Sequence, residues 1–183
     1  MTDPLSPCQT WPISPLIQVT LGSLYLTLTV PLPWLAAYSG VNLSPLGLGV
    51  AIALGFLFLM GILSEQVIST ETGLQVGYPR WVFWLRGKGW SICWQEIQSL
   101  KMRTTGQGGL VYYLIGKDQQ RAYLLPMRIR NFQELIATIT TQTGIDTTDV
   151  RPLAQPWMYW MLLGLTVLLG LVDLWTVTTV LGG

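Results

Sequence analysis

The residue types that most often perform chemistry in proteins are scarce in this 183-residue sequence. It contains no histidine, which removes the usual general base and a ligand found in most metal sites. Its two cysteines, Cys8 and Cys93, are far apart and form neither a disulfide framework nor a C-x-x-C site. Cys93 lies in an apolar, strand-like stretch, where we expect it to pack as a small structural hydrophobic residue.

The glycine-rich run at residues 106–109 is not a phosphate-binding loop, because no helix opening with Lys-Ser/Thr follows it. We interpret this run as a hairpin tip. The missing histidine also removes the commonest axial ligand of haem and disfavours pigment binding. The sequence therefore predicts no catalytic residues, no metal and no cofactor. A membrane enzyme or transporter would need a pocket around Glu96, Glu134 or Asp173.

One segment, residues 78–90, alternates aromatic rings with cations. Such a segment suits the headgroup layer of a membrane, because rings partition into the interface and cations meet anionic lipid. It suits a protein partner equally, since buried tryptophan and arginine dominate binding hot spots. A buried strand with a basic turn is the third interpretation. The candidate binding residues of this aromatic–basic segment are Arg80, Trp81, Phe83, Trp84, Arg86 and Lys88.

A second group of basic residues follows further along the chain. This group is a candidate patch for phospholipid or for an acidic loop of a partner, and a solvated face is the alternative. Its members are Lys101, Arg103, Arg121, Arg128 and Arg130.

Asp173 lies within an otherwise apolar stretch. A carboxylate in lipid is costly and needs a partner or a route to water. It follows Trp157 by roughly 24 Å of helix, which places it near the far headgroups. We therefore expect either an interfacial acid or a hydrogen bond to a helix of a partner subunit.

The distribution of charge shows which part of the chain is in water. Charged residues make up only 10% of the sequence, against roughly 25% in soluble domains. All ten Lys and Arg, and seven of the nine acids, lie within residues 64–151. Outside that stretch only Asp3 and Asp173 are charged. A polar module is thus bracketed by segments that prefer lipid.

Three segments, residues 16–38, 46–63 and 157–180, are apolar and long enough to cross a hydrocarbon core of about 30 Å. Pro31 and Pro33 should kink or fray the end of the first. Four glycines in the second would allow close packing of helices, either within this hairpin or against another protein. They are Gly47, Gly49, Gly55 and Gly61.

Residues 1–15 contain four prolines and no basic residue. The prolines predict an irregular N-terminal tail, with Trp11 resting at the headgroups. The missing basic residues argue against a secretory signal peptide.

The polar module, residues 64–144, has the pattern of strands followed by one helix. Asn131 should cap that helix, Gly144 should end it, and the stripe from Phe132 to Ile139 should face the core. Residues 145–156 read as a linker to the third span. The predicted strands are residues 65–70, 74–78, 90–94, 97–103, 110–115 and 121–125.

The basic residues also predict an orientation. Ten lie within residues 64–151 and none in the connection at residues 39–45. Because basic residues stay on the inner side, we expect the module on the cytoplasmic side.

Three stretches of the module, Ser69–Leu74, Trp94–Leu100 and Asn131–Leu135, resemble bacterial pleckstrin-homology-like (PH-like) domains attached to two membrane helices. The resemblance implies an α+β fold, a PH-like β-sandwich or barrel closed by a C-terminal helix. Here the module is inserted between the second and third of three transmembrane helices. The third helix departs from the commonest arrangement.

Three further stretches, Leu110–Leu114, Tyr123–Arg128 and Gly144–Val150, are similar to cyanobacterial thylakoid membrane proteins. Two helices followed by a PH-like domain also resemble an assembly factor of photosystem I. These resemblances imply a non-enzymatic scaffold or assembly factor on a larger membrane complex, a photosystem, with photosystem II favoured over photosystem I. A membrane-anchored module that binds lipid headgroups is the alternative. Nucleic acid is not expected as a partner.

Overall fold

The computed structural model describes residues 8–38, 44–82, 84, 87, 89–104, 106, 110–118, 121–148, 150 and 156–181. The chain forms two compact units. The β-rich unit comprises Met1–Ser14 and Ser64–Ala154, and the helical unit comprises Pro15–Leu63 and Gln155–Gly183.

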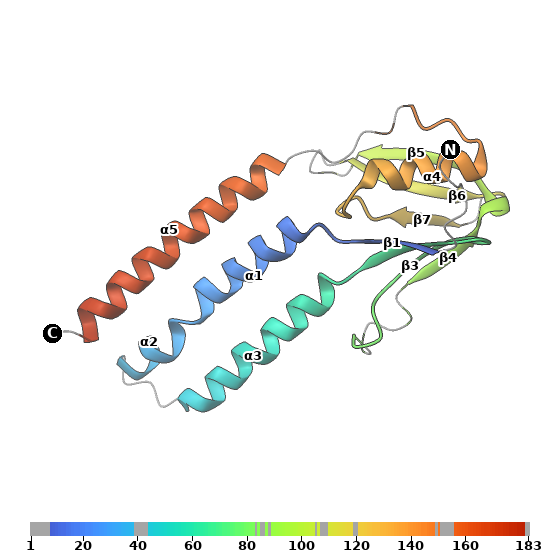
Figure 1. The fold of residues 1–183 in the computed structure, drawn as a ribbon. Helices are drawn as coiled ribbons and strands as arrows, with labels where there is room; N and C mark the ends of the chain where they lie inside the picture. The colour runs from blue at the N-terminus through green and yellow to red at the C-terminus, as the bar shows by residue number, and fades with distance from the viewer. Residues whose placement is uncertain are drawn as a thin grey trace. The chain divides into compact units, whose positions relative to one another are not determined.

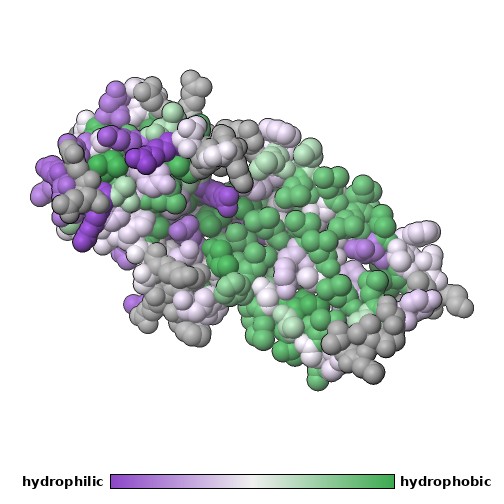
Figure 2. Space-filling view, turned by 180° about the vertical axis from the view of Figure 1, so that it is seen from behind, coloured by the Kyte–Doolittle hydropathy of each residue, from purple (hydrophilic) through white to green (hydrophobic). Residues whose placement is uncertain are grey.

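The helical unit contains α1 (Pro15–Thr29), α2 (Leu32–Tyr38), α3 (Pro45–Ile62) and α5 (Pro156–Leu181). Within this unit α1 lies between α3 and α5 (Figure 1). Three stretches, Pro15–Tyr38, Pro45–Ile62 and Trp157–Thr179, are long and apolar enough to cross a membrane. Their surface is covered with apolar side chains, while hydrophilic ones gather on the β-rich unit (Figure 2). The chain is therefore a membrane protein.

The first span is broken where the two prolines lie, as the sequence predicts. The amide of Val30 still donates to the Leu26 carbonyl at 2.8 Å, and Leu35 donates to the Pro31 carbonyl at 3.1 Å. Between them the helix ends and α2 begins, because Pro31 and Pro33 have no N–H to continue the ladder.

The glycines of α3 divide into two kinds. A Cβ on Gly55 would collide with the hydroxyl of Tyr25 on α1, and that hydroxyl donates to the Ile52 carbonyl at 2.9 Å. Gly49, in contrast, faces open space. Close packing within the hairpin thus accounts for Gly55 but not for Gly49.

The β-rich unit has two antiparallel sheets. The first has the order β1-β2-β3-β4 and the second β5-β6-β7, so the unit is α+β with α4. The strands of the first sheet are β1 (Cys8–Pro12), β2 (Gln66–Thr70), β3 (Gly73–Gly77) and β4 (Trp90–Cys93). Those of the second are β5 (Ile97–Thr104), β6 (Leu110–Gly116) and β7 (Ala122–Leu125).

Strand β1 corrects the prediction of an irregular tail for residues 1–15. Residues Cys8–Pro12 pair with β2, and Trp11 lies opposite Val67. Trp11 is 2% exposed and belongs to the core, so it does not rest at the headgroups. The prolines did not prevent a strand, because Pro12 is its last residue and β1 is an edge, where a missing N–H is tolerated.

Two tryptophans join the sheets. The indole of Trp94, in the short helix η2 (Trp94–Glu96) between β4 and β5, donates to the Thr70 carbonyl at 3.0 Å. The indole of Trp90 on β4 donates to the Leu124 carbonyl on β7 at 3.1 Å. A buried donor that reaches a carbonyl avoids the desolvation cost of an unpaired group.

Helix α4 (Phe132–Thr143) buries the predicted stripe of Phe132, Leu135, Ile136 and Ile139. Gly144 ends it in the left-handed conformation (φ 68°), and its amide donates to the Thr140 carbonyl at 2.8 Å. Asn131 is the N-cap residue, but its side chain accepts no backbone N–H. It donates instead to Glu134 Oε2 at 3.1 Å, so the predicted position was right and the capping mechanism wrong.

Candidate functional site

One end of the first sheet gathers residues that are distant in the sequence. Ile13 N donates to the Glu65 carbonyl at 3.3 Å, and Ser14 N donates to the Arg128 carbonyl at 2.9 Å. Arg130 N donates to the Pro12 carbonyl at 2.8 Å, and Ile13 bridges to Ile129. We call this group, Pro12–Ser14, Glu65 and Arg128–Arg130, the junction cluster.

The junction cluster brings together two predicted binding residues. Arg128 and Arg130 flank Ile129, which is 5% exposed, while both arginines are exposed. Backbone hydrogen bonds hold residues 128–130 in place: Arg130 bonds to Pro12 of β1, and Arg128 bonds to Ser14, which follows β1. The two cations therefore have a defined place rather than lying on a free loop.

Glu65 is the acid of the cluster. Its partial burial raises the pKa of the carboxyl, and the positive charge of Arg128 acts in the opposite direction. Gln66 of β2 pairs with Gly77 of β3, so the same antiparallel register brings Glu65 opposite Tyr78. Burial and the negative charge of Glu65 both raise the pKa of the Tyr78 phenol. Tyr78 opens the aromatic–basic segment, so that segment begins at the junction cluster.

Beyond Tyr78 the chain turns, and Val82 N donates to the Pro79 carbonyl at 3.0 Å. Val82 is buried, whereas Arg80 is exposed, Trp81 is 50% exposed and Trp84 is 38% exposed. The two indoles meet edge to face, with ring centroids 6.3 Å apart. The interpretation as a buried strand is therefore wrong for residues 79–82. Phe83, Arg86 and Lys88 lie outside the described residues.

The remaining basic residues lie elsewhere in the β-rich unit. Lys101 and Arg103 are exposed on β5 of the second sheet, and Arg121 precedes β7. Arg128 and Arg130 lie beside β1, while Lys101, Arg103 and Arg121 belong to the second sheet or adjoin it. A single basic patch stays a prediction for these residues.

The acids considered for an enzyme have local partners. Glu134 accepts hydrogen bonds from the amides of Gln9 and Asn131, and Glu96 Oε2 accepts from the amide of Cys93 at 3.3 Å. Within the part of the chain that the structure describes, no group of three metal-ligating side chains occurs. Cys93 is exposed, which corrects the expectation that it packs inside the strand. Most of the glycine-rich run 106–109 lies outside the described residues.

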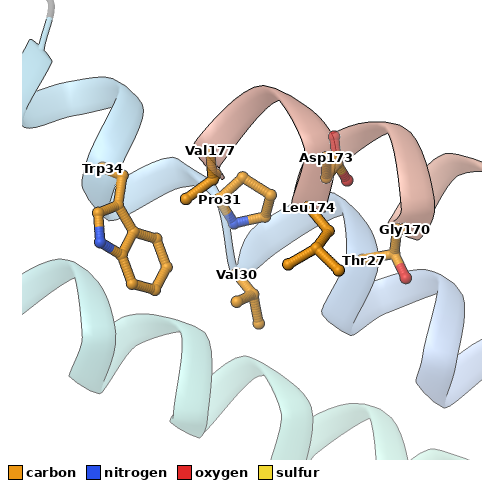
Figure 3. Close-up of a pocket in the computed structure, with 8 residues that line it drawn as sticks. All are labelled: Thr27, Val30, Pro31, Trp34, Gly170, Asp173, Leu174 and Val177. Atoms are coloured by element: carbon orange, nitrogen blue, oxygen red, sulfur yellow. The ribbon is translucent and has the colours of Figure 1, made fainter. Parts of the chain in front are cut away.

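Asp173 lines a groove of about 260 Å³ in the helical unit. Figure 3 shows Val30, Pro31 and Trp34 of the α1–α2 break across from Leu174 and Val177 of α5. Thr27 lies next to Gly170, one turn from Asp173. The carboxylate is half-buried rather than fully exposed to the surroundings.

Sequence reasoning missed Glu65 and Ser14 as members of the site. Two signals were present: Glu65 is the first charge after the second apolar segment, and Ser14 the last polar residue before the first. Neither signal shows that these residues meet Arg128, because that contact is formed by strand pairing over long sequence separations.

The raised pKa of Glu65 gives a stability prediction. Below the ordinary carboxyl pKa of about 4.5, Glu65 is protonated in both the folded and the unfolded state, so its burial costs little free energy. As the pH rises through the raised folded-state pKa, the buried form must ionise and stability falls. Glu65→Gln should remove this loss, so its melting temperature relative to wild type rises as the pH is raised above about 4.5.

Melting of the detergent-purified full chain across that pH range measures the effect. Glu71→Gln is the matched control, since Glu71 is exposed in the turn after β2. A Glu65→Gln variant whose melting temperature runs parallel to wild type at every pH would show that Glu65 is not buried as described.

Comparisons with known proteins give one family relationship. No family model matches the chain, and no solved structure matches it. The chain is 51% identical over 160 residues to a protein of the cyanobacterium Synechocystis sp. named Uncharacterized protein slr0269. The match covers 87% of this chain and 80% of that protein. Because most of both chains is matched at this identity, the chain belongs to the same protein family as slr0269.

Proposed function

We propose that the protein is a non-enzymatic scaffold or assembly factor that is integral to the membrane and docks on a larger membrane complex. The complex we propose is a photosystem in a thylakoid membrane, photosystem II in preference to photosystem I. The cyanobacterial relative and the three candidate spans support this setting. Two antiparallel sheets followed by α4 support a PH-like fold for the β-rich unit.

The observation that carries the proposal is the set of residues at the end of the first sheet where the junction cluster lies. Pro12 of β1 is paired with Gln66 of β2. Along the sequence, α1 begins three residues after Pro12, and α3 ends four residues before Gln66. The exposed Arg80, Trp81 and Trp84 follow directly from Tyr78 at this same end. An exposed group of tryptophan and arginine has the composition of a binding hot spot.

This end of the sheet also favours the cytoplasmic orientation. Arg128 and Arg130 are each hydrogen-bonded through the backbone to a residue within three positions of the start of α1, namely Ser14 and Pro12. Basic residues close to the ends of spans are retained on the inner side of the membrane.

Affinity isolation of the full chain from its native membrane tests the proposal. We expect a large complex to be recovered in a fixed ratio, and a Trp81→Ala/Trp84→Ala variant to recover several-fold less of it. Met102→Ala is the matched control, because Met102 is an exposed apolar residue on β5. Recovery of the protein without any stoichiometric complex would overturn the proposal.

A second candidate function, binding of anionic lipid headgroups, is favoured by one specific observation. The backbone of Arg128 is hydrogen-bonded to Ser14, and Ser14 is the residue before α1. The backbone of Arg128 is therefore held by the residue that leads into a span, and we expect an anionic headgroup to meet its guanidinium there. Each basic residue near such a surface contributes about 1 kcal/mol.

Thermal melting of the purified full chain with phosphatidylglycerol or phosphatidylcholine measures this contribution. We expect phosphatidylglycerol to raise the melting temperature more, and the difference to shrink at high salt. The double variant Arg128→Gln/Arg130→Gln should lose most of the difference, and Lys101→Gln/Arg103→Gln should keep it. If both variants showed the same difference in melting temperature between the two lipids, the junction cluster would not be the lipid-binding site.

A further inference from the structure

The groove that Asp173 lines has mainly apolar walls and no cation of its own. Asp173 is the only charged residue in the sequence of the helical unit, and every Lys and Arg lies between Arg80 and Arg151. The sequence has no histidine that could serve instead. No residue of this unit can therefore neutralise the carboxylate.

The break between α1 and α2 adds a second acceptor. In an unbroken helix the residue four positions on would donate to the Thr27 carbonyl, but that residue is Pro31, which has no N–H. Thr27 and Pro31 line the same groove as Asp173. Thr27, whose carbonyl lacks its helical donor, and Asp173 thus line one apolar groove.

The depth of Asp173 makes the missing partner costly. The span ends at Thr179, six residues after Asp173, which corresponds to roughly 9 Å along the helix axis. An ionisable side chain inside a span normally faces a partner or a polar cavity. The other residues of this groove are mainly apolar and none carries a positive charge, so they cannot neutralise it: Val30, Pro31, Trp34, Gly170, Leu174 and Val177.

We propose that this groove receives a transmembrane helix of another protein, and that a Lys or Arg of that helix pairs with Asp173. The apolar walls suit the hydrocarbon stem of a basic side chain, and the Asp173 carboxylate suits its charged end. This inference rests on the proposed docking function, since the partner helix belongs to the complex. A second copy of the chain does not fit, because its own spans contain no Lys or Arg.

Two measurements on the full chain in its native membrane test the pairing. In the first, Asp173→Asn should lower recovery of the complex about three- to tenfold, as expected for the loss of one polar contact within lipid. Asp173→Glu should restore part of it, and Thr176→Val should match wild type. Thr176 is the matched control because its hydroxyl is exposed and donates to Val172 of its own helix at 2.8 Å.

In the second measurement, a photo-crosslinking residue replaces Leu174, which lines the groove, or Leu165, which is exposed on α5 outside it. Position 174 should give an adduct with a partner span that contains a Lys or Arg, and position 165 should not. An adduct with a second copy, with lipid alone or with a span lacking basic residues overturns the inference.

The two proposals fail in different ways. If the complex is recovered but Asp173→Asn changes nothing, the docking function stands and the pairing at Asp173 is wrong. If no complex is recovered from wild type, both are wrong.

Discussion

Replacing Trp11 by alanine is expected to lower the free energy of unfolding of the β-rich unit by about 3–5 kcal/mol, the usual cost of removing a buried tryptophan. Trp11 is 2% exposed and belongs to the core cluster of both sheets and α4. Its loss leaves a cavity under β1, an edge strand that pairs only with β2. The junction cluster should then open, because Ile13 and Ser14 continue from β1.

Hydrogen exchange of the full chain in detergent measures this prediction locally. Amides of residues 8–14 and 66–70 should lose protection most in Trp11→Ala. Trp11→Phe should be much milder, because the Trp11 indole N–H is buried without a hydrogen-bond partner among the described residues. Trp81→Ala, at an exposed tryptophan, should cost about 1 kcal/mol or less. Equal effects at Trp11 and Trp81 would mean that β1 is not part of the core.

Replacing Gly73 by valine is expected to destabilise the first sheet by about 3 kcal/mol or more. A Cβ at this position would collide with the carbonyl oxygen of Ile92 and lie 2.9 Å from the Cα of Cys93. Both are backbone atoms of β4, which is paired with β3 there, so no side chain can move aside. The strands would have to separate.

Gly77→Ala is the matched control, since Gly77 is on the same strand and a Cβ there would meet nothing within 4 Å. It should change stability by less than about 1 kcal/mol. Melting of the full chain and exchange of the amides of β3 and β4 both report the difference. A tolerated Gly73→Val would contradict the close approach of β3 and β4.

Elements set by local sequence patterns were predicted well. The apolar stripe of α4 and its end at Gly144 follow from spacing and from the conformational freedom of glycine, both of which are local. The break near Pro31 follows from a missing N–H. The strands from β2 to β7 were located within a few residues, because their alternation is also local.

The N-terminal strand could not be predicted in the same way. Residues 8–12 have no extended alternation of their own, and proline is abundant around them. They are ordered by pairing with β2, which lies more than 50 residues away, and by burial of Trp11. Local propensity carries no information on such a partner.

The candidate binding residues show the same difference between what is local in the sequence and what depends on distant contacts. The sequence singled out Trp81, Arg128 and Asp173 by residue type alone. The tertiary structure decided that Arg128 meets Ser14 and Glu65 at the junction end of the first sheet. It also placed Lys101 and Arg103 on β5 of the second sheet.

The sequence by itself determined the division between lipid and water: three apolar spans, and one polar stretch, residues 64–151, that holds every basic residue. It could do so because transfer free energy depends on composition summed over about 20 neighbouring residues. Only the tertiary structure decided which polar groups lie together, at Glu65 and Arg128 and at Thr27 and Asp173. Those proximities arise from strand pairing and helix packing between residues distant in the chain, and such contacts leave no local pattern.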